Sequence, residues 1–142
     1  MAPARVILPA AVRKAVVEAA LTVNPLECCG LLIGSGDDVV RVTEAVPMAN
    51  VADQPRRRFA IDPQAHIDVL RRFRDGPATV VGHYHSHPGG PAQPSAHDLE
   101  MAFDPTAVWL IAAIGQDKIE LSAYRAEADR SRFVPLELSI AA

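Results

Sequence analysis

Three histidines stand at alternate positions, His83, His85 and His87, within a stretch of strand-forming residues. Successive side chains of a strand point to opposite faces, so the three imidazoles are predicted to share one face while Tyr84 and Ser86 point to the other. Imidazole is the commonest zinc ligand in proteins, and a catalytic zinc takes three protein ligands and keeps one position for water or substrate. The pattern therefore indicates a metal site, with surface histidines on a solvated strand as the alternative.

Ser95 and Asp98 form a second chemical pattern downstream. A serine followed three residues later by an acid is typical of a helix start, because the hydroxyl caps a free backbone amide. The same spacing would let Asp98, one turn into the helix, supply a carboxylate oxygen as a third metal ligand while Ser95 points its hydroxyl at the site. The two interpretations are compatible, since the Ser95 backbone can begin the helix whichever way its side chain points.

The spacing of these residues resembles the signature of a known family. The order is His85, one residue, His87, seven residues, Ser95, two residues and Asp98, which is similar to the motif of the JAMM or MPN+ (JAB1/MPN/Mov34) zinc metallopeptidases. Upstream, the segment around Glu27 resembles the glutamate segment of that family. The resemblance covers nearly the whole chain and indicates a compact, prokaryotic-type member.

The resemblance implies a role for each matching residue. His85, His87 and Asp98 would bind Zn²⁺ together with a water, Glu27 would act on that water as general acid/base, and Ser95 would donate a hydrogen bond to the oxyanion. Zinc lowers the pKa of a bound water from about 15.7 towards 7 and polarises the scissile carbonyl. The nearness of Glu27 to the metal follows from the resemblance alone, because 58 positions separate Glu27 from His85.

The resemblance also implies an activity and a partner. JAMM proteins typically cut a peptide or isopeptide bond after the C-terminal Gly-Gly of ubiquitin or a ubiquitin-like protein, and compact prokaryote-like members often act on a sulfur-carrier protein. We therefore expect a zinc metallopeptidase, an isopeptidase of the deubiquitinase-like kind, that binds an extended Gly-Gly tail by strand addition at a sheet edge. One alternative is a non-catalytic MPN-type scaffold, and another is a zinc hydrolase of a cell-wall or phage-associated peptide amide. The basic run Arg56–Arg58 is either a contact for an acidic partner or a solvated loop.

The remaining histidines and cysteines fall outside the motif. His83 is expected to support the ligands or contact substrate, or alternatively to complete a three-histidine site, and His97 is expected on a helix surface. Cys28 and Cys29 are adjacent and lack the two-residue gap of a zinc-chelating pair. The chain also lacks the Pro-Cys-x-x-Cys segment of nucleoside and base deaminases, which argues against that chemistry.

The elements that must position these residues follow from apolar periodicity and from turn residues. Apolar positions at helical spacing, Ile67, Leu70 and Phe73, predict a helix with a buried face. We expect an α/β fold of the JAMM/MPN (cytidine-deaminase-like) type, with a mixed, largely antiparallel sheet flanked by about three helices, in one domain over residues 1–142. The expected helices cover residues 9–23, 63–74 and 95–103, and the expected strands cover residues 5–8, 28–33, 39–46, 59–61, 79–87, 107–114, 118–124 and 133–140.

Composition and charge restrict the class of protein. The 142 residues are 49% apolar, enough for one buried core, and 14 basic against 17 acidic residues give a net charge of −3. Such a balance offers no positive field for nucleic acid or an anionic membrane. No apolar run is long enough to cross a bilayer and the first residues do not resemble a signal peptide, so we expect a cytoplasmic protein. The residues carry no signal of an oligomeric state.

Overall fold

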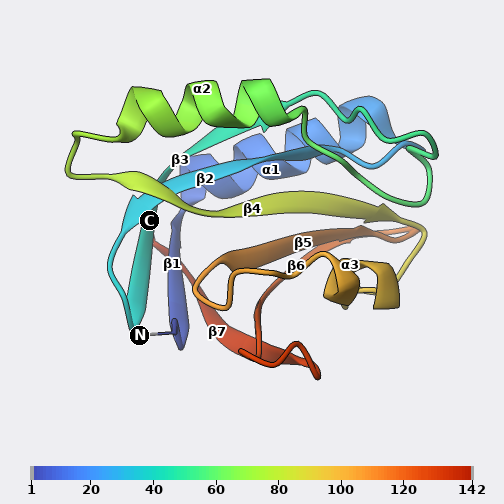
Figure 1. Ribbon diagram of the computed structural model, residues 1–142. Helices are drawn as coiled ribbons and strands as arrows, with labels where there is room; N and C mark the ends of the chain where they lie inside the picture. The colour runs from blue at the N-terminus through green and yellow to red at the C-terminus, as the bar shows by residue number, and fades with distance from the viewer. Residues whose placement is uncertain (1, 142) are drawn as a thin grey trace.

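The computed structural model describes residues 2–141, which form seven strands and three helices (Figure 1). The strands and helices follow the chain in the order β1 (Arg5–Pro9), α1 (Ala10–Val23), β2 (Cys29–Ser35), β3 (Val39–Met48), α2 (Pro63–Phe73), β4 (Thr79–Pro88), α3 (Ala96–Glu100), β5 (Val108–Ile114), β6 (Ile119–Ala126) and β7 (Phe133–Ala141). The mixed α/β class is confirmed. The predicted single domain of residues 1–142 stays a prediction, and its two end residues lie outside the described part.

The strands close into a ring in the order β1-β3-β2-β4-β5-β6-β7. Neighbours are antiparallel in β2–β3, β2–β4, β5–β6 and β6–β7, and parallel in β1–β3, β1–β7 and β4–β5. The ring closes because the first and last strands pair over five residues, from Arg5 with Glu137 to Pro9 with Ala141. Closure was not expected from the sequence, since hairpin-length connections carry no information on which distant strands pair.

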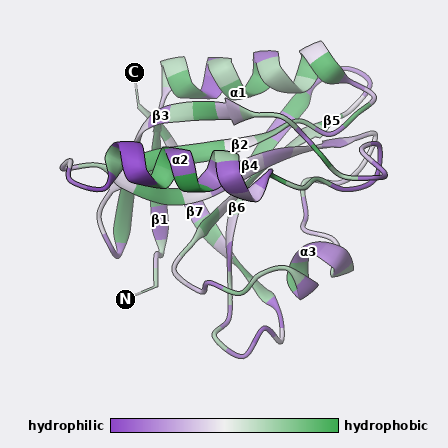
Figure 2. Cartoon of the chain, turned by 45° about the horizontal axis from the view of Figure 1, so that its top comes forward, coloured by the Kyte–Doolittle hydropathy of each residue, from purple (hydrophilic) through white to green (hydrophobic). Residues whose placement is uncertain are grey.

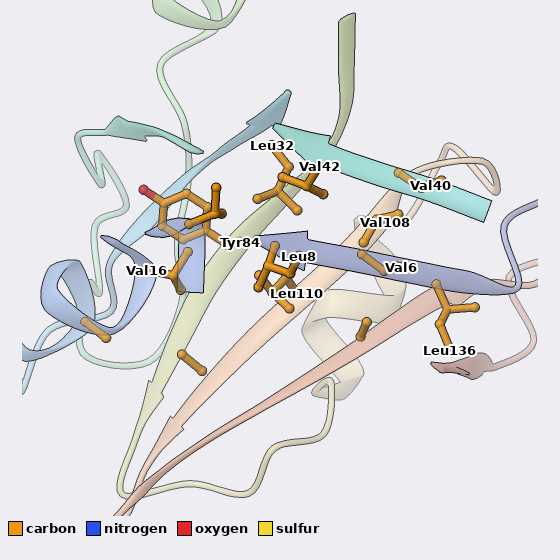
Figure 3. Close-up of a cluster of buried hydrophobic side chains, with 14 of the residues drawn as sticks. Val6, Leu8, Val16, Leu32, Val40, Val42, Tyr84, Val108, Leu110 and Leu136 are labelled. Atoms are coloured by element: carbon orange, nitrogen blue, oxygen red, sulfur yellow. The ribbon is translucent and has the colours of Figure 1, made fainter. Parts of the chain in front are cut away.

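Helix α1 packs against the main apolar core. Its buried side chains, Val12, Val16 and Ala20, are spaced by four residues and so lie on one face of the helix. The strand side chains that meet them are large and aliphatic or aromatic (Figure 3). They include Val6, Leu8, Leu32, Val40, Val42, Tyr84, Val108, Leu110 and Leu136.

Helix α2 packs against the opposite side of β2, where Leu31 and Ile33 meet Val69. Side chains alternate along a strand, which explains why Leu32 points to the α1 side and its two neighbours to the α2 side. Figure 2 shows hydrophilic bands along α2. The expectation that Ile67, Leu70 and Phe73 form the buried face of this helix was wrong for the first two residues.

The apolar residues of α2 divide between the sheet and the solvent. Val69 and Phe73 are directed to the sheet, whereas Ile67 and Leu70 are 41% and 45% exposed. A helix with few apolar residues allows more than one face to be chosen from periodicity, and the packing on β2 selects the face that carries Val69.

Two further elements differ from the expectation. Residues 59–61 form only an isolated bridge, between Asn50 and Ile61, and α3 ends at Glu100 rather than at Phe103. Within residues 2–141, no helix has the length and apolar character needed to cross a membrane.

Candidate metal centre

Strand β4 delivers the histidines to one side of the sheet. His83 and His85 contact the rings of Phe59 and Trp109, whereas Tyr84 on the same strand is buried in the α1 core. The predicted alternation of faces is therefore confirmed. Ser86 points to the other side too, where its Oγ accepts a hydrogen bond of 2.8 Å from the Cys28 amide.

Helix α3 brings Asp98 to the same place. Ser95 caps the helix, because its Oγ accepts the Asp98 amide at 3.1 Å and Asp98 Oδ2 accepts the Ser95 amide at 2.8 Å. This capping box is the local structure that the sequence predicted. It fixes the Asp98 carboxylate so that Oδ2 lies 3.4 Å from Nε2 of His85 and 3.4 Å from Nε2 of His87.

The three side chains meet through one atom each, at distances suited to zinc. The two Nε2 atoms of His85 and His87 lie 3.1 Å apart, and each is 3.4 Å from Asp98 Oδ2. Two ligand atoms that are each about 2.0–2.1 Å from a tetrahedral zinc lie roughly 3.3–3.4 Å from one another. The donor set, two imidazoles and a carboxylate, is one that zinc binds, so both chemistry and spacing fit the metal.

The two imidazoles are held by different contacts. His87 donates from Nδ1 to the Pro91 carbonyl at 3.0 Å, which leaves Nε2 free of hydrogen in the neutral ring and directed at the cluster. The His85 ring is completely buried and stacks on Phe59, with ring centroids 4.4 Å apart and planes inclined by 21°. Contacts within the protein therefore orient both rings.

Glu27 lies beside this cluster although it is distant in the chain. One carboxylate oxygen of Glu27 and one ring nitrogen each of His85 and His87 lie within 4.8 Å of one another, a group that could hold a metal ion or a water next to it. The Glu27 side chain is buried, with Oε1 lacking a hydrogen-bond partner in the described part of the chain. A buried carboxylate oxygen without a partner costs free energy, and a ligand in the site would supply one.

Burial and mutual contacts shift the protonation of all four groups. Burial raises the pKa of Glu27 to about 7, with the charge of His87 opposing and that of Asp98 adding to the rise. Burial lowers the pKa of His85 below its usual value, against the hydrogen bond and charge of Asp98. Burial also acts to lower the pKa of His87 and to raise the pKa of Asp98. The contacts between the groups outweigh burial, so that the pKa of His87 is raised and the pKa of Asp98 is lowered.

The remaining predicted residues lie around the cluster. His83 packs edge-on against Trp109 at 4.2 Å, and burial lowers its pKa to about 3, so it is a neutral ring. Its centroid is 6.1 Å from that of His85, against 4.9 Å between His85 and His87, which favours the later pair over a three-histidine site. His97 lies on the α3 surface, 3.9 Å from Glu100.

The cysteines and the arginine run are not part of the group of candidate ligands among the described residues. Cys28 and Cys29 are buried free thiols. Arg56 and Arg57 are exposed and line a shallow pocket together with Leu26.

Two residues near the site were not expected to matter. Phe59 was expected in a short strand, and Asn50 was not singled out. Phe59 stacks on His85, and Asn50 makes four hydrogen bonds, one of them to the Glu27 carbonyl. Neither residue has a spacing relative to the histidines that could have pointed to the site.

The sequence and the fold each match known proteins. A model of the family described as prokaryotic homologs of the JAB domain matches residues 9–128. A desampylase of Haloferax volcanii is 41% identical over 87 residues, which are 61% of this chain and 62% of that protein. A CysO-cysteine peptidase of Mycobacterium tuberculosis is 33% identical over 104 residues, 72% of this chain and 69% of that one. The chain thus aligns with about three fifths of the Haloferax relative.

Solved structures extend the match to nearly all of the chain. A protein of Desulfitobacterium hafniense, 29% identical, superposes with a TM-score of 0.83 over 96% of this chain and 92% of its own. A protein of Salinibacter ruber, 30% identical, has a TM-score of 0.68 over 95% and 90%. The overall fold is therefore one already seen in solved proteins.

Proposed function

Since the chain belongs to the family of prokaryotic homologs of the JAB domain, we propose that it is a zinc-dependent peptidase that cuts the amide bond after the C-terminal Gly-Gly of a ubiquitin-like or sulfur-carrier protein. One observation carries the proposal. Three ligand atoms of His85, His87 and Asp98 lie within 3.4 Å of one another, and the buried carboxylate of Glu27 lies beside them. A metal site with a neighbouring proton carrier is the minimum that amide hydrolysis by this route requires.

His85, His87 and Asp98 would hold the zinc. The low pKa of Asp98 keeps it a carboxylate, and the low pKa of His85 keeps it a neutral imidazole, which are the forms that bind a metal. When bound, zinc would supply Lewis acidity towards the attacking water and the scissile carbonyl. The Phe59 ring and the Pro91 carbonyl keep the two imidazoles oriented.

Glu27 moves the proton. Its carboxylate accepts a proton from the attacking water and then gives it to the departing amine. Burial raises the pKa of Glu27 to about 7 in the metal-free protein, which favours a carboxyl group that can hold a proton. The water oxygen bonds to the carbonyl carbon, the carbon–nitrogen bond breaks, and the proton passes through Glu27 to the amine nitrogen. The products are a free carboxyl end on the small protein and a free amine.

Ser95 would stabilise the charge that develops on the carbonyl oxygen. Its Oγ accepts the Asp98 amide hydrogen, which leaves the hydroxyl hydrogen for donation to the oxyanion. Removing one such donor typically costs about 10²–10³ in rate. The role in the cap and the role in catalysis use opposite sides of one hydroxyl group.

The substrate class rests on the relatives. A desampylase, a CysO-cysteine peptidase and, in Thermus thermophilus, a probable TtuB-protein conjugate cleaving protease are similar to this chain, the last with 33% identity over 55% of this chain and 50% of that protein. These names describe cleavage at or near the junction of a small protein with another molecule. We extend that activity to this chain and assign the Gly-Gly tail to an extended backbone beside the sheet.

The closed ring changes where such a tail would bind. The described strands include no free edge strand, but β3 pairs with β1 only over Val39–Arg41, so the later part of β3 is paired on one side only. That part of β3 leads to the loop that carries Arg56–Arg58. We assign the tail to this half-open edge.

We also assign the protein to the cytoplasm, because its two cysteines are free thiols, as is usual in a reducing compartment.

A cleavage assay tests the proposal. The zinc-loaded protein is mixed with a ubiquitin-like protein whose C-terminal Gly-Gly is fused to a reporter, and mass spectrometry locates the cut. We expect cleavage directly after the second glycine, loss with a chelator, recovery with zinc, and no cleavage by folded Glu27→Gln. Cleavage of a muropeptide instead of the fusion would assign the other amide, and cleavage of neither by zinc-loaded protein would point to a scaffold.

A further inference from the structure

Glu27 lies outside the sheet, and a loop holds its backbone. It sits between α1 and β2, where no strand partner provides backbone hydrogen bonds. Its amide donates to the Pro55 carbonyl at 2.7 Å, and its carbonyl accepts from Asn50 Nδ2 at 3.0 Å. Both partners belong to the segment 49–62 between β3 and α2, here named the bridging loop. The position of the proton carrier therefore depends on this loop.

Asn50 is the centre of the bridging loop. Its Nδ2 donates to the carbonyls of Glu27 and Arg58, at 3.0 and 3.1 Å. Its Oδ1 accepts the amides of Ala52 and Ala60, at 3.0 and 3.1 Å. A primary amide has two donor hydrogens and two acceptor lone pairs, so all of its capacity is used.

The same loop touches the metal ligands through Phe59. The residue directly after Arg58, whose carbonyl Asn50 binds, is Phe59, and its ring stacks on His85 at 4.4 Å. One side chain thus connects the segment of Glu27 to the residue that orients His85. Because Asn50 binds both segments, it links the position of the Glu27 backbone to the position of the Phe59 ring on His85.

We propose that Asn50 is a positioning residue, which fixes the Glu27 carboxylate relative to the metal ligands by bonding the Glu27 carbonyl and the bridging loop with one side chain. The inference rests on the proposed function, since it assigns Asn50 a part in the same hydrolysis. Proton transfer demands tight geometry, and a displacement of about 1 Å can cost about a hundredfold in rate. We therefore expect substitution of Asn50 to lower kcat and to leave zinc binding unchanged.

Two substitutions separate the bonds that Asn50 makes. Asn50→Asp keeps the one oxygen that accepts the Ala52 and Ala60 amides. Its second oxygen replaces Nδ2, so both donors are lost and a carboxylate oxygen faces the Glu27 and Arg58 carbonyls. Asn50→Ala loses all four hydrogen bonds. The matched control is Asp53→Asn, the reverse isosteric change at an exposed position of the same loop.

The experiment measures cleavage of the Gly-Gly fusion, zinc content and amide hydrogen exchange on each folded protein. We expect zinc content and KM to be unchanged in Asn50→Asp, kcat to fall about tenfold or more, and the Glu27 amide to exchange at least about tenfold faster while Ala60 stays protected. In Asn50→Ala both amides should exchange faster. Asp53→Asn should match the wild type in every readout.

Three results would overturn the inference. One is an unchanged kcat in both folded Asn50 variants, even with a lower midpoint of denaturation, because a purely structural residue would behave in that way. Another is a Glu27 amide that exchanges freely in the wild type, which decides the matter even when neither variant folds. A zinc-loaded wild type that cleaves nothing overturns the proposed function and this inference with it, whereas an active wild type with unaltered variants overturns the inference alone.

Discussion

Neutralising Glu27 should change how the stability of the metal-free protein depends on pH. The side chain is 4% exposed, and burial raises its pKa from 4.5 to about 7. The substitution Glu27→Gln keeps the shape of the side chain and removes the titrating proton. A chelator must be present, because a bound zinc would add its own charge and alter the pKa of the neighbouring carboxyl.

The magnitude follows from linkage between protonation and folding. The unfolded chain loses the Glu27 proton near pH 4.5 and the native protein keeps it to about pH 7, so the native state binds more protons in this window. The contribution of Glu27 to the stability of the wild type therefore falls as the pH rises from 4.5 to 7. A difference of 2.5 pH units at about 1.36 kcal/mol per unit gives a loss of about 3 kcal/mol, present above pH 7 and absent below pH 4.5.

Urea denaturation of both proteins at pH 4.5 and pH 8 checks the prediction. The urea midpoint of Glu27→Gln minus that of the wild type should be larger at pH 8 than at pH 4.5. The increase should exceed about 1 M urea, given a slope of about 1–3 kcal/mol per M. The control is Glu120→Gln on β6, where the side chain is exposed and should show no such difference. Parallel pH profiles for Glu27→Gln and the wild type would refute the assignment of a buried, proton-holding Glu27.

Three further predictions concern the frame of the site. Ser86→Ala leaves the buried Cys28 amide without its acceptor and should lower the free energy of unfolding by about 1–3 kcal/mol, measured by urea denaturation; an unchanged midpoint would contradict it. Gly82→Ala places a Cβ in a steric clash with the carbonyl oxygen of Val108, which belongs to the paired backbone of β5, so the free energy of unfolding should fall by about 3 kcal/mol or more in the same measurement. A fall no larger than that of an alanine substitution on the surface would contradict this prediction. Burial and the charges of Cys28 and Glu27 raise the pKa of Cys29 to about 12. A thiol reagent at pH 8 should therefore label Cys29 only as fast as the protein unfolds, and rapid labelling of the native protein would contradict this prediction.

The local parts of the site could be predicted because they depend on short-range geometry. The period of two along a strand separates His85 from Tyr84, and the helix-start pattern at Ser95 places Asp98 in the first turn. The family, expected from the motif spacing, is confirmed by the match over residues 9–128, and the mixed α/β class, expected from apolar periodicity and turn residues, is confirmed by the observed elements. These features each rest on residues close together in the chain.

The parts that could not be predicted depend on contacts between distant segments. Pairing of β1 with β7 closes the ring, and no pattern within either strand specifies the other. The choice of Val69 over Ile67 as the buried side of α2 depends on what β2 presents to it. Asn50 and Phe59 acquire their importance only when the bridging loop folds over Glu27 and His85. Such residues have ordinary loop composition and become visible only in three dimensions.

Zinc per folded chain is the quantity that tests the metal centre most directly. Elemental analysis is made on the purified wild type and on His85→Ala and Asp98→Ala, with circular dichroism to show that each protein is folded. We expect close to one zinc per chain in the wild type and none above background in either variant, because each loses one of three ligands. A wild type that takes up no zinc after supplementation, or two folded variants that both keep it, would contradict the assignment of these residues as the metal site.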